Sequence, residues 1–344
     1  MTLRIGIGLF TGQIPAGSSR TLAQEYGETL ELVRLAESLG FDSAWVSEHH
    51  GSSDGYLPSL LPMLAAFAAV TERIELGTGI LLTPLHDPLR LAEDAAVVDQ
   101  LSNGRLILGL GLGWREEEFR MFGASMRERA RRTTDTIEVL RRAWTGRRFS
   151  FEGRTMRFDR VRVTPTPARP GGPRIFLGGY DDRGLRRAGR LADGYITDAT
   201  EPDDLRHALS VLDEGARSAG RDPRTLAVAL TQNAFPWTEG DHWKLLREGL
   251  TQQLGAYTAW DAGHDTPEHD ALAPTLAEEE ARRWTVAGPP EEVVAALGPL
   301  VTRNEDRDEL HLVVRLHYPG MDLATAARAT SLFAAEVAPA LRAL

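Results

Sequence analysis

The side chains best suited to proton chemistry near neutral pH stand together in the run Ser47-Glu48-His49-His50. A carboxylate beside two imidazoles can hydrogen-bond the edge of a cofactor or transfer protons. We therefore take Glu48, His49 and His50 as the candidate catalytic residues. Adjacent side chains at a strand end point apart, so one of the two histidines could equally be a structural residue.

A metal site at the same place is the obvious alternative. The chain has no cysteine, and its first predicted strand carries no His-x-His pair and no aspartate partner. His86, His311 and His317 are scattered along the chain, as structural or exposed histidines usually are. We expect no metal.

Glycine-rich strand ends indicate where a flat ligand would fit. Gly77-Thr78-Gly79 ends one predicted strand, and Gly109, Gly111 and Gly113 alternate at the end of the next. Alternate glycines remove side chains from one face and leave room for something planar, although a tight barrel bend is an alternative. The alternating glycines match neither a P-loop, which needs Lys-Ser/Thr, nor a dinucleotide fingerprint.

A possible anion site is the turn Gly178-Gly179-Tyr180-Asp181-Asp182, which opens a predicted helix. Free N–H groups at a helix start can cradle a phosphate. Either aspartate could instead be an ordinary N-cap. A basic run follows the fourth strand, either as a solvated helix face or within reach of a phosphate: Arg127, Arg129, Arg131 and Arg132.

Eight short β-type runs alternate with helical segments along the chain and position these residues. They are residues 4–10, 43–47, 74–82, 105–110, 174–177, 194–197, 226–231 and 309–316. Eight βα units favour a closed (β/α)8 TIM barrel, in which active sites lie at the carboxyl ends of the strands. We expect one domain over 1–344, with a hairpin insertion at 146–173 after helix four. A lid or substrate-facing insertion is expected at 236–288, after strand seven.

Composition narrows the function classes. The chain has 344 residues, 42% of them hydrophobic, and a net charge of −10, which argues against nucleic acid or an anionic membrane as partner. The absence of cysteine excludes disulfides and cysteine nucleophiles. No stretch approaches the roughly 20 apolar residues of a membrane span, and the start of the chain indicates a strand and not a signal peptide. We expect a cytoplasmic protein.

The order of the motifs resembles the bacterial-luciferase-like family of flavin-dependent oxidoreductases over almost the whole chain. The matching stretches are residues 40–50, 77–79, 86–94, 99–106, 117–119, 122–123 and 191–194. The resemblance implies a barrel, commonly dimeric, that binds flavin mononucleotide (FMN). A separate reductase would supply the reduced flavin, and oxygen would then be used on a small organic substrate.

The resemblance also implies roles for individual residues. His49 corresponds to the family's catalytic histidine, with Glu48 and His50 beside it. Thr78, Gly79 and Ile80 would lie against the flavin ring, with a cis peptide between Gly79 and Ile80, and Gly111 stands where luciferase has a reactive cysteine. The residues implied at the phosphate are Gly178, Gly179 and Tyr180, with Arg129 or Arg132 as helpers.

Two departures from the family pattern concern the cofactor. Leu112 stands where many members have arginine, and Tyr180-Asp181 stands where many have serine. Besides an FMN monooxygenase, a deazaflavin-dependent hydride-transfer enzyme is an alternative that the sequence does not separate from it. A flavin-binding barrel without turnover is a third, favoured if Asp181 and Asp182 block the phosphate site. Aromatic and polar residues of the insertion and of the last strand end are expected to cover or line the pocket, although those of the insertion could equally pack internally: Trp237, His242, Trp243, Tyr257, Trp260, Arg315, His317 and Tyr318.

Overall fold

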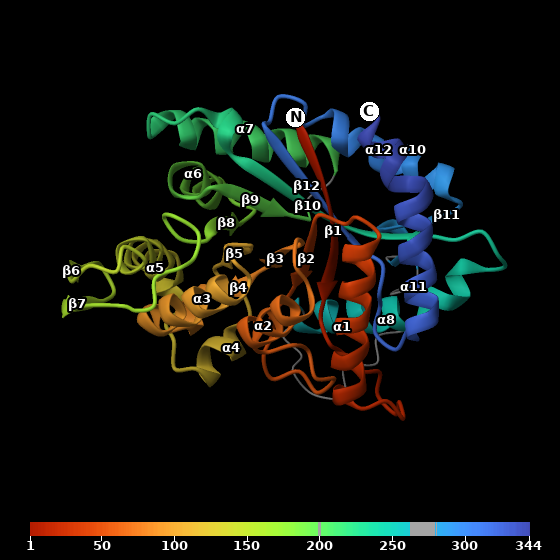
Figure 1. The fold of residues 1–344 in the computed structure, drawn as a ribbon, viewed down its shortest axis with the longest axis horizontal. Coiled ribbons are helices and arrows are strands. Elements are labelled where there is room, and N and C mark those ends of the chain that lie inside the picture. Colours follow the sequence, from red (N-terminus) through yellow and green to blue (C-terminus); the bar gives the residue numbers. More distant parts are fainter. Residues whose placement is uncertain (199–200, 262–278, 280) are drawn as a thin grey trace.

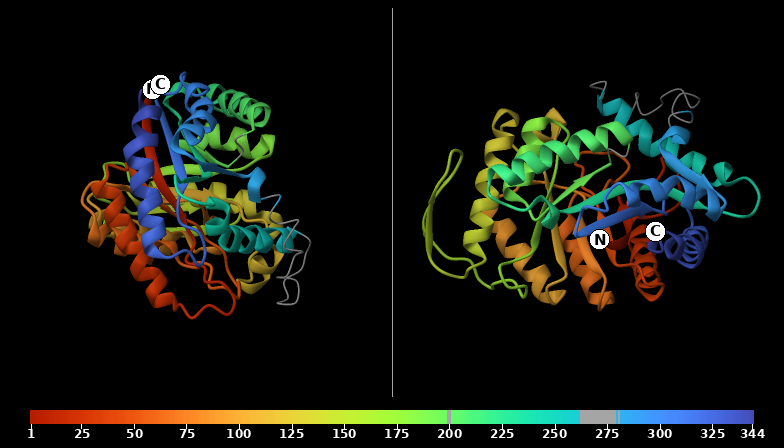
Figure 2. Two further views of the ribbon diagram at one scale, coloured as in Figure 1. Left: turned by 90° about the vertical axis from the view of Figure 1, so that its right-hand side faces the viewer. Right: turned by 90° about the horizontal axis from the view of Figure 1, so that it is seen from above.

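Eight parallel strands close into a barrel in the computed structural model, which describes residues 1–198, 201–261, 279 and 281–344 (Figures 1 and 2). In chain order around the barrel they are β1 (Thr2–Phe10), β2 (Ser43–Val46), β3 (Glu75–Thr78), β5 (Leu106–Gly111), β8 (Arg174–Gly178), β9 (Gly194–Thr197), β10 (Ala227–Pro236) and β12 (Glu309–Arg315). Each strand pairs in parallel with the next, and β12 pairs with β1. The predicted (β/α)8 barrel is confirmed.

Helices cover the outside of the barrel (Figure 1). They are α1 (Leu22–Ser38), α2 (Leu60–Val70), α3 (Pro88–Leu101), α5 (Arg129–Ala143), α6 (Asp182–Leu191), α7 (Pro202–Ser218), α10 (Pro290–Thr302), α11 (Leu323–Leu332) and α12 (Ala338–Arg342). The N-caps follow the sequence: the carboxylate of Asp87 accepts from Leu89 N and Arg90 N, and Asp181 accepts from Gly184 N. Within the described ranges, no helix is long and apolar enough to cross a membrane.

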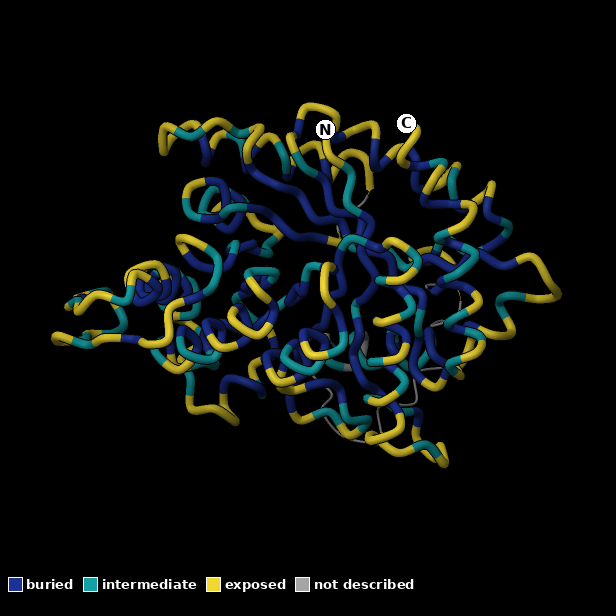
Figure 3. The backbone as a smooth tube through the Cα atoms, viewed as in Figure 1, coloured by how far each residue is buried: buried dark blue, intermediate teal, exposed yellow. Residues whose placement is uncertain are grey.

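The strands at the centre of the barrel are buried (Figure 3), and a cluster of side chains fills the inside. The inner cluster consists of Trp45, Ile107, Phe176, Ile196, Ala227, Ala229 and Val313. Gly77 makes room for this packing, since a Cβ there would lie 2.2 Å from the indole of Trp45. Because the interior is full, a ligand site must lie at a barrel end.

Two insertions depart from the plain barrel. The predicted hairpin is present as β6 (Phe149–Glu152) and β7 (Arg157–Val161), an antiparallel pair that projects beside α5 (Figure 1). The second insertion contains α8 (His242–Asp261) and β11 (Thr285–Gly288), which pairs in parallel with β10. Residues 262–278 and 280 of that insertion lie outside the described residues.

Several short elements complete the chain. These are β4 (Leu81–Leu82) and α4 (Glu116–Met121), with single helical turns at Thr83–Leu85, Met126–Glu128 and Pro223–Thr225 and a π-helical turn at Phe333–Val337. Strand β4 pairs with β5, so the chain after β3 stays on the barrel rim. This places the residues that follow β2, β3 and β5 around one opening.

Candidate functional site

A cavity of about 580 Å³ lies at the carboxyl ends of the barrel strands. Its volume is within the range of small-molecule and cofactor sites. Its lining includes Leu9, Glu48, His49, Gly79, Ile80, Trp114, Gly178, Gly179, Tyr180, Ile196, Asp198, Glu201, Asp204, Tyr257 and Arg315. The mouth of the barrel is therefore the candidate active site.

His49 is held at the cavity by a buried carboxylate on α4. Its Nδ1 lies 2.9 Å from Glu118 Oε1, and the same oxygen accepts from His50 N at 2.9 Å and from Arg115 at 3.3 Å. Because Glu118 accepts hydrogen bonds from these neighbours, Nδ1 of His49 is the donor and its Nε2 lone pair is left available. No partner for Nε2 occurs among the described residues.

Four aromatic rings enclose the imidazole of His49. The ring centroids of Trp260 and Tyr56 lie 4.7 and 4.8 Å away, and those of Tyr257 and Trp114 lie 5.5 and 6.3 Å away. The hydroxyls of Tyr56 and Tyr257 are hydrogen-bonded at 3.0 Å, which ties α8 to the chain after β2. The enclosure limits access of water to the histidine.

The insertion thus reaches the site through α8. Tyr257 lines the cavity and Trp260 packs on His49, as expected for a substrate-facing segment. Trp237 and Trp243 instead pack internally: Trp237 stacks on Phe235, and Trp243 packs against the hydrophobic core.

Glu48 lines the same cavity, and its carboxylate accepts three hydrogen bonds from the protein. It accepts from His50 Nε2 at 2.7 Å, from His86 Nε2 at 3.0 Å and from Leu82 N at 2.8 Å. Burial alone would raise the pKa of this carboxyl, but the hydrogen bonds from His50 and His86 outweigh burial and lower the pKa to about 2. Glu48 is an ionised carboxylate that fixes β4 and the two histidines.

His50 points away from the cavity. Its imidazole bonds to Glu48, and its ring packs against Phe122 with centroids 4.6 Å apart. It is not among the lining residues. Of the two adjacent histidines, the geometry leaves His49 to face a ligand.

The glycine-rich strand ends do not form the flat slot predicted from their spacing. A Cβ on Gly109 would lie 1.9 Å from the carbonyl oxygen of Thr78, and one on Gly111 would lie 1.9 Å from Ile80 Cδ1. These glycines make room for the protein's own atoms, so that interpretation is wrong.

The segment after β3 nevertheless borders the cavity. The Gly79–Ile80 peptide is cis, as predicted, and both residues line the cavity. The Thr78 hydroxyl is buried and donates to Gly109 O at 2.7 Å. Thr78 and Gly111 are not in the lining, and their roles stay predictions.

The predicted phosphate turn lies at the cavity edge beside an acidic rim. Gly178, Gly179 and Tyr180 line the cavity, and the Tyr180 hydroxyl donates to Asp198 at 2.7 Å. Asp198, Glu201 and Asp204 line the same side. Asp181 is the N-cap of α6, so the simpler interpretation of that aspartate is confirmed.

The two predicted arginine helpers are directed elsewhere. Arg132 donates to the carbonyls of Pro84 and His86 at 3.0 and 3.1 Å, and Arg129 donates to Met126 O at 3.2 Å. Neither lines the cavity. Their predicted contact with a phosphate stays a prediction.

Arg315, at the end of β12, is the cation that faces the cavity. The residue is 6% exposed, and its buried NH1 has no hydrogen-bond partner in the described part of the chain. A buried guanidinium without a partner is costly, so the site is prepared for a negatively charged or strongly polar ligand group. His317 and Tyr318, which we expected beside it, lie outside the lining.

Sequence reasoning did not single out Glu118 or Tyr56. Glu118 follows His49 by 69 positions, and only the closure of the barrel brings α4 to the end of β2. Two signals were available: Glu118 falls in the stretch 117–119 that carries the family resemblance, and it ends a run of three glutamates at 116–118.

Comparisons with known proteins agree with this architecture. A family model described as luciferase-like monooxygenase matches residues 3–303. The chain is 30% identical over 340 residues to an F420-dependent glucose-6-phosphate dehydrogenase of Nakamurella multipartita, covering 94% of this chain and 95% of that protein. It is 32% identical over 332 residues to the protein of the same name from Kineococcus radiotolerans, covering 92% of this chain and 93% of that protein.

Solved structures show the same barrel. Monooxygenase RslO1 from Streptomyces bottropensis is similar with a TM-score of 0.78 and 27% identity, covering 98% of this chain and 99% of that one. An F420-dependent secondary alcohol dehydrogenase is similar with a TM-score of 0.76 and 20% identity, covering 99% of each chain. The second likeness supports the fold alone.

Proposed function

The chain belongs to the luciferase-like monooxygenase family, an oxidoreductase family, and on that premise we propose that it is a deazaflavin-dependent oxidoreductase of the F420 type. From the sequence alone, a deazaflavin-dependent enzyme was an alternative to an FMN monooxygenase. We now prefer it because several relatives that match more than nine-tenths of the chain are named as F420-dependent enzymes. The observation that carries the proposal is His49, held by Glu118 with Nε2 open to the cavity.

The cavity suits a planar cofactor with a polar edge. Leu9, Ile80 and Ile196 provide apolar walls, and Gly79 and Gly179 bring backbone close to the ligand space. Arg315 offers an unpartnered guanidinium to a polar or anionic group. When bound, a deazaflavin gives or accepts a hydride without using oxygen.

In the proposed reaction the protein's own side chains accept the proton that the substrate releases. Oxidation of an alcohol to a carbonyl releases a hydroxyl proton, and Nε2 of His49 is placed to accept a proton from the cavity. Glu118 keeps the other ring nitrogen protonated and fixes the ring orientation. The surrounding aromatic side chains restrict water at this position.

The sugar phosphate in the relatives' names is not part of the proposal. Arg315 is the single cation among the described lining residues, whereas Asp198, Glu201 and Asp204 make the rim acidic. An acidic rim disfavours a phosphorylated substrate at that side. We propose a small, neutral alcohol or carbonyl compound, because Arg315 is already assigned to the polar or anionic group of the cofactor.

An FMN-dependent monooxygenase is the second candidate. It is favoured by the likeness to RslO1, which at 27% identity extends beyond a shared fold. This candidate adds a separate flavin reductase as partner. For both candidates we propose a homodimer.

Titration with the two cofactors separates the candidates. Purified protein is titrated with F420 and with FMN, and cofactor fluorescence reports binding. We expect F420 to bind at least about tenfold more tightly than FMN. Tighter binding of FMN would favour the monooxygenase, and binding of neither would end both proposals.

A histidine variant tests the role of the site in turnover. His49→Gln should still bind the cofactor but should lose at least about 100-fold in turnover against a panel of alcohols and carbonyl compounds. His207→Gln is the matched control, because His207 is exposed on α7 and pairs with Asp182. Full activity of His49→Gln would contradict the assignment of the proton acceptor.

A further inference from the structure

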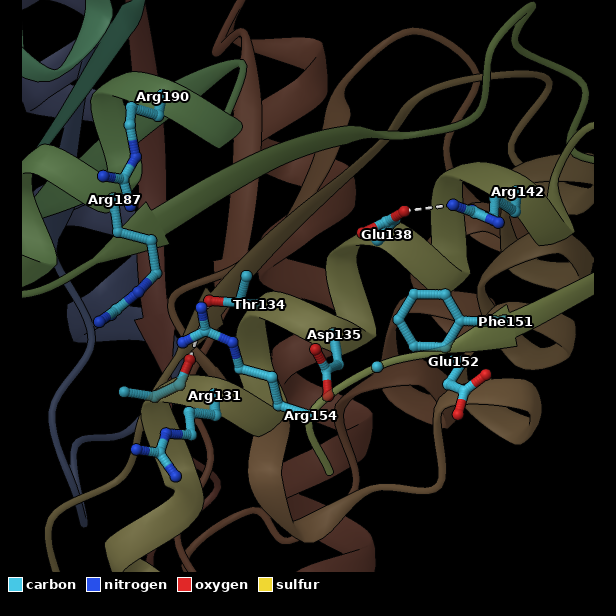
Figure 4. Close-up of a pocket in the computed structure, with 12 residues that line it drawn as sticks. Arg131, Thr134, Asp135, Glu138, Arg142, Phe151, Glu152, Arg154, Arg187 and Arg190 are labelled. Carbon is cyan, nitrogen blue, oxygen red and sulfur yellow. Dashed lines mark hydrogen bonds and ion pairs between the residues drawn. The ribbon is translucent and has the colours of Figure 1, made fainter. Parts of the chain in front are cut away.

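A second cavity, of about 540 Å³, lies outside the barrel between α5, α6 and the β6–β7 hairpin (Figure 4). Five arginines line it: Arg131 and Arg142 from α5, Arg154 from the hairpin, and Arg187 and Arg190 from α6. None of its lining residues belongs to the cavity at the barrel mouth. It is therefore a separate feature of the surface.

The carboxylates of this cavity are mostly engaged with other groups. Glu138 is ion-paired with Arg142, as the dashed line in Figure 4 shows. Asp135 accepts from the backbone N and the hydroxyl of Thr155 at 2.7 and 2.8 Å. Glu152 is exposed on the hairpin.

Among the residues that the structure describes, four guanidinium groups of the cavity have no protein partner. In the part of the chain that the structure describes, no hydrogen bond or ion pair is made by the side chains of Arg131, Arg154, Arg187 and Arg190. Burial lowers the pKa of Arg187, and the charge of Arg190 acts in the same direction while Asp181 opposes it. Such an excess of cations is unexpected on a chain with a net charge of −10.

The walls of the cavity are fixed to one another. Arg142 donates to Ser150 O at 3.1 Å, which joins α5 to the hairpin, and Arg141 donates to Leu191 O at 3.1 Å, which joins α5 to the end of α6. Gly153 lets the hairpin turn pack closely, since a Cβ there would lie 2.5 Å from the nearest side chain. The arginines are therefore presented from three connected elements and not from one mobile surface.

We propose that this cavity binds a small molecule that carries two or more oxyanion groups, either phosphates or carboxylates. Guanidinium groups bind both kinds of anion through paired N–H donors, and four of them from three elements suit more than one such group. The volume matches a small molecule, and the acidic remainder of the protein opposes a nucleic acid.

Calorimetric titration of the full chain tests this proposal independently of any flavin. The probes are tripolyphosphate and citrate, which distinguish phosphate from carboxylate ligands, and acetate as a single-charge reference. We expect at least one polyanion to bind about tenfold or more tightly than acetate, with binding that weakens as salt is added. Failure of both polyanions to bind below about 1 mM would overturn the proposal.

Matched variants distinguish a built site from general charge attraction. Arg154→Ala and Arg187→Ala should each weaken polyanion binding by about tenfold. Arg206→Ala, an exposed α7 arginine paired with Asp203, makes the same charge change elsewhere and should leave binding unchanged. An equal loss in all three variants would refute the site. Because Arg154 is exposed on the hairpin, a loss of binding in its variant is not explained by disruption of the core.

Discussion

Replacing Glu48 by glutamine should destabilise the folded protein by about 3 kcal/mol at pH 7. Glu48 is buried and accepts three hydrogen bonds, from His50, His86 and the backbone of Leu82. Burial would raise its pKa, but the bonds from the two histidines lower the pKa from 4.5 to about 2. That fall corresponds to about 3 kcal/mol in favour of the charged form in the folded state.

The effect of the Glu48 carboxylate on stability depends on pH in a defined direction. Because the folded-state pKa lies below the unfolded value of 4.5, the stabilisation is complete above about pH 5 and is lost as the pH falls toward 2. At pH 3.5 about 2 kcal/mol of it should remain. The difference between wild type and Glu48→Gln should therefore shrink on acidification.

Urea unfolding followed by tryptophan fluorescence at pH 7 and pH 3.5 measures both quantities. Glu214→Gln is the control, since Glu214 is exposed and pairs with Arg186 on the surface, where an ion pair contributes little. Equal stability of Glu48→Gln and wild type at pH 7 would refute the reasoning. So would a stability difference that stays constant between the two pH values.

Two further substitutions test positioning and packing. Glu118→Gln keeps an acceptor for Nδ1 of His49 but removes the charge, so it should lower kcat about tenfold or more with little change in KM, measured by steady-state kinetics. Equal activity would show that Glu118 does not position the histidine. Gly189→Ala should lower the free energy of unfolding by about 1–3 kcal/mol, although alanine favours helices. The added Cβ would lie 2.1 Å from Leu212 O where α6 crosses α7, and a stabilised variant in urea unfolding would contradict this.

The barrel was predictable from the sequence because each strand is short, apolar and bounded by helical segments. All eight predicted runs are strands of the barrel; the run 194–197 matches β9 at both ends, and no other end shifts by more than five residues. The largest shift is in β10, which continues to Pro236 where the sequence indicated an end at residue 231. Its last four residues pair with β11, a strand contributed by the insertion some 50 positions later. The residue pattern of a strand does not predict that it will pair with a strand so distant in the sequence.

The glycine pattern shows a different limit of sequence reasoning. A glycine indicates that something approaches the backbone closely, but not what approaches. At Gly77 the neighbour is the indole of Trp45, and at Gly111 it is the side chain of Ile80. In both cases the space is used for packing of the barrel interior, which the residue types alone do not distinguish from a ligand slot.

The polar run after β2 was correctly placed at the mouth of the barrel. The separate roles of its residues, however, depend on side chains that are distant in the sequence. In the loop that follows β2, the imidazoles of His49 and His50 bond to different carboxylates: Glu118 from α4 and Glu48 from the same run. The rings that enclose His49 come in part from α8, some 200 positions later. In a parallel barrel the loops after successive strands converge whatever their separation in sequence. The sequence therefore predicts which segments meet at the site, whereas the pairing of side chains follows from the closed geometry.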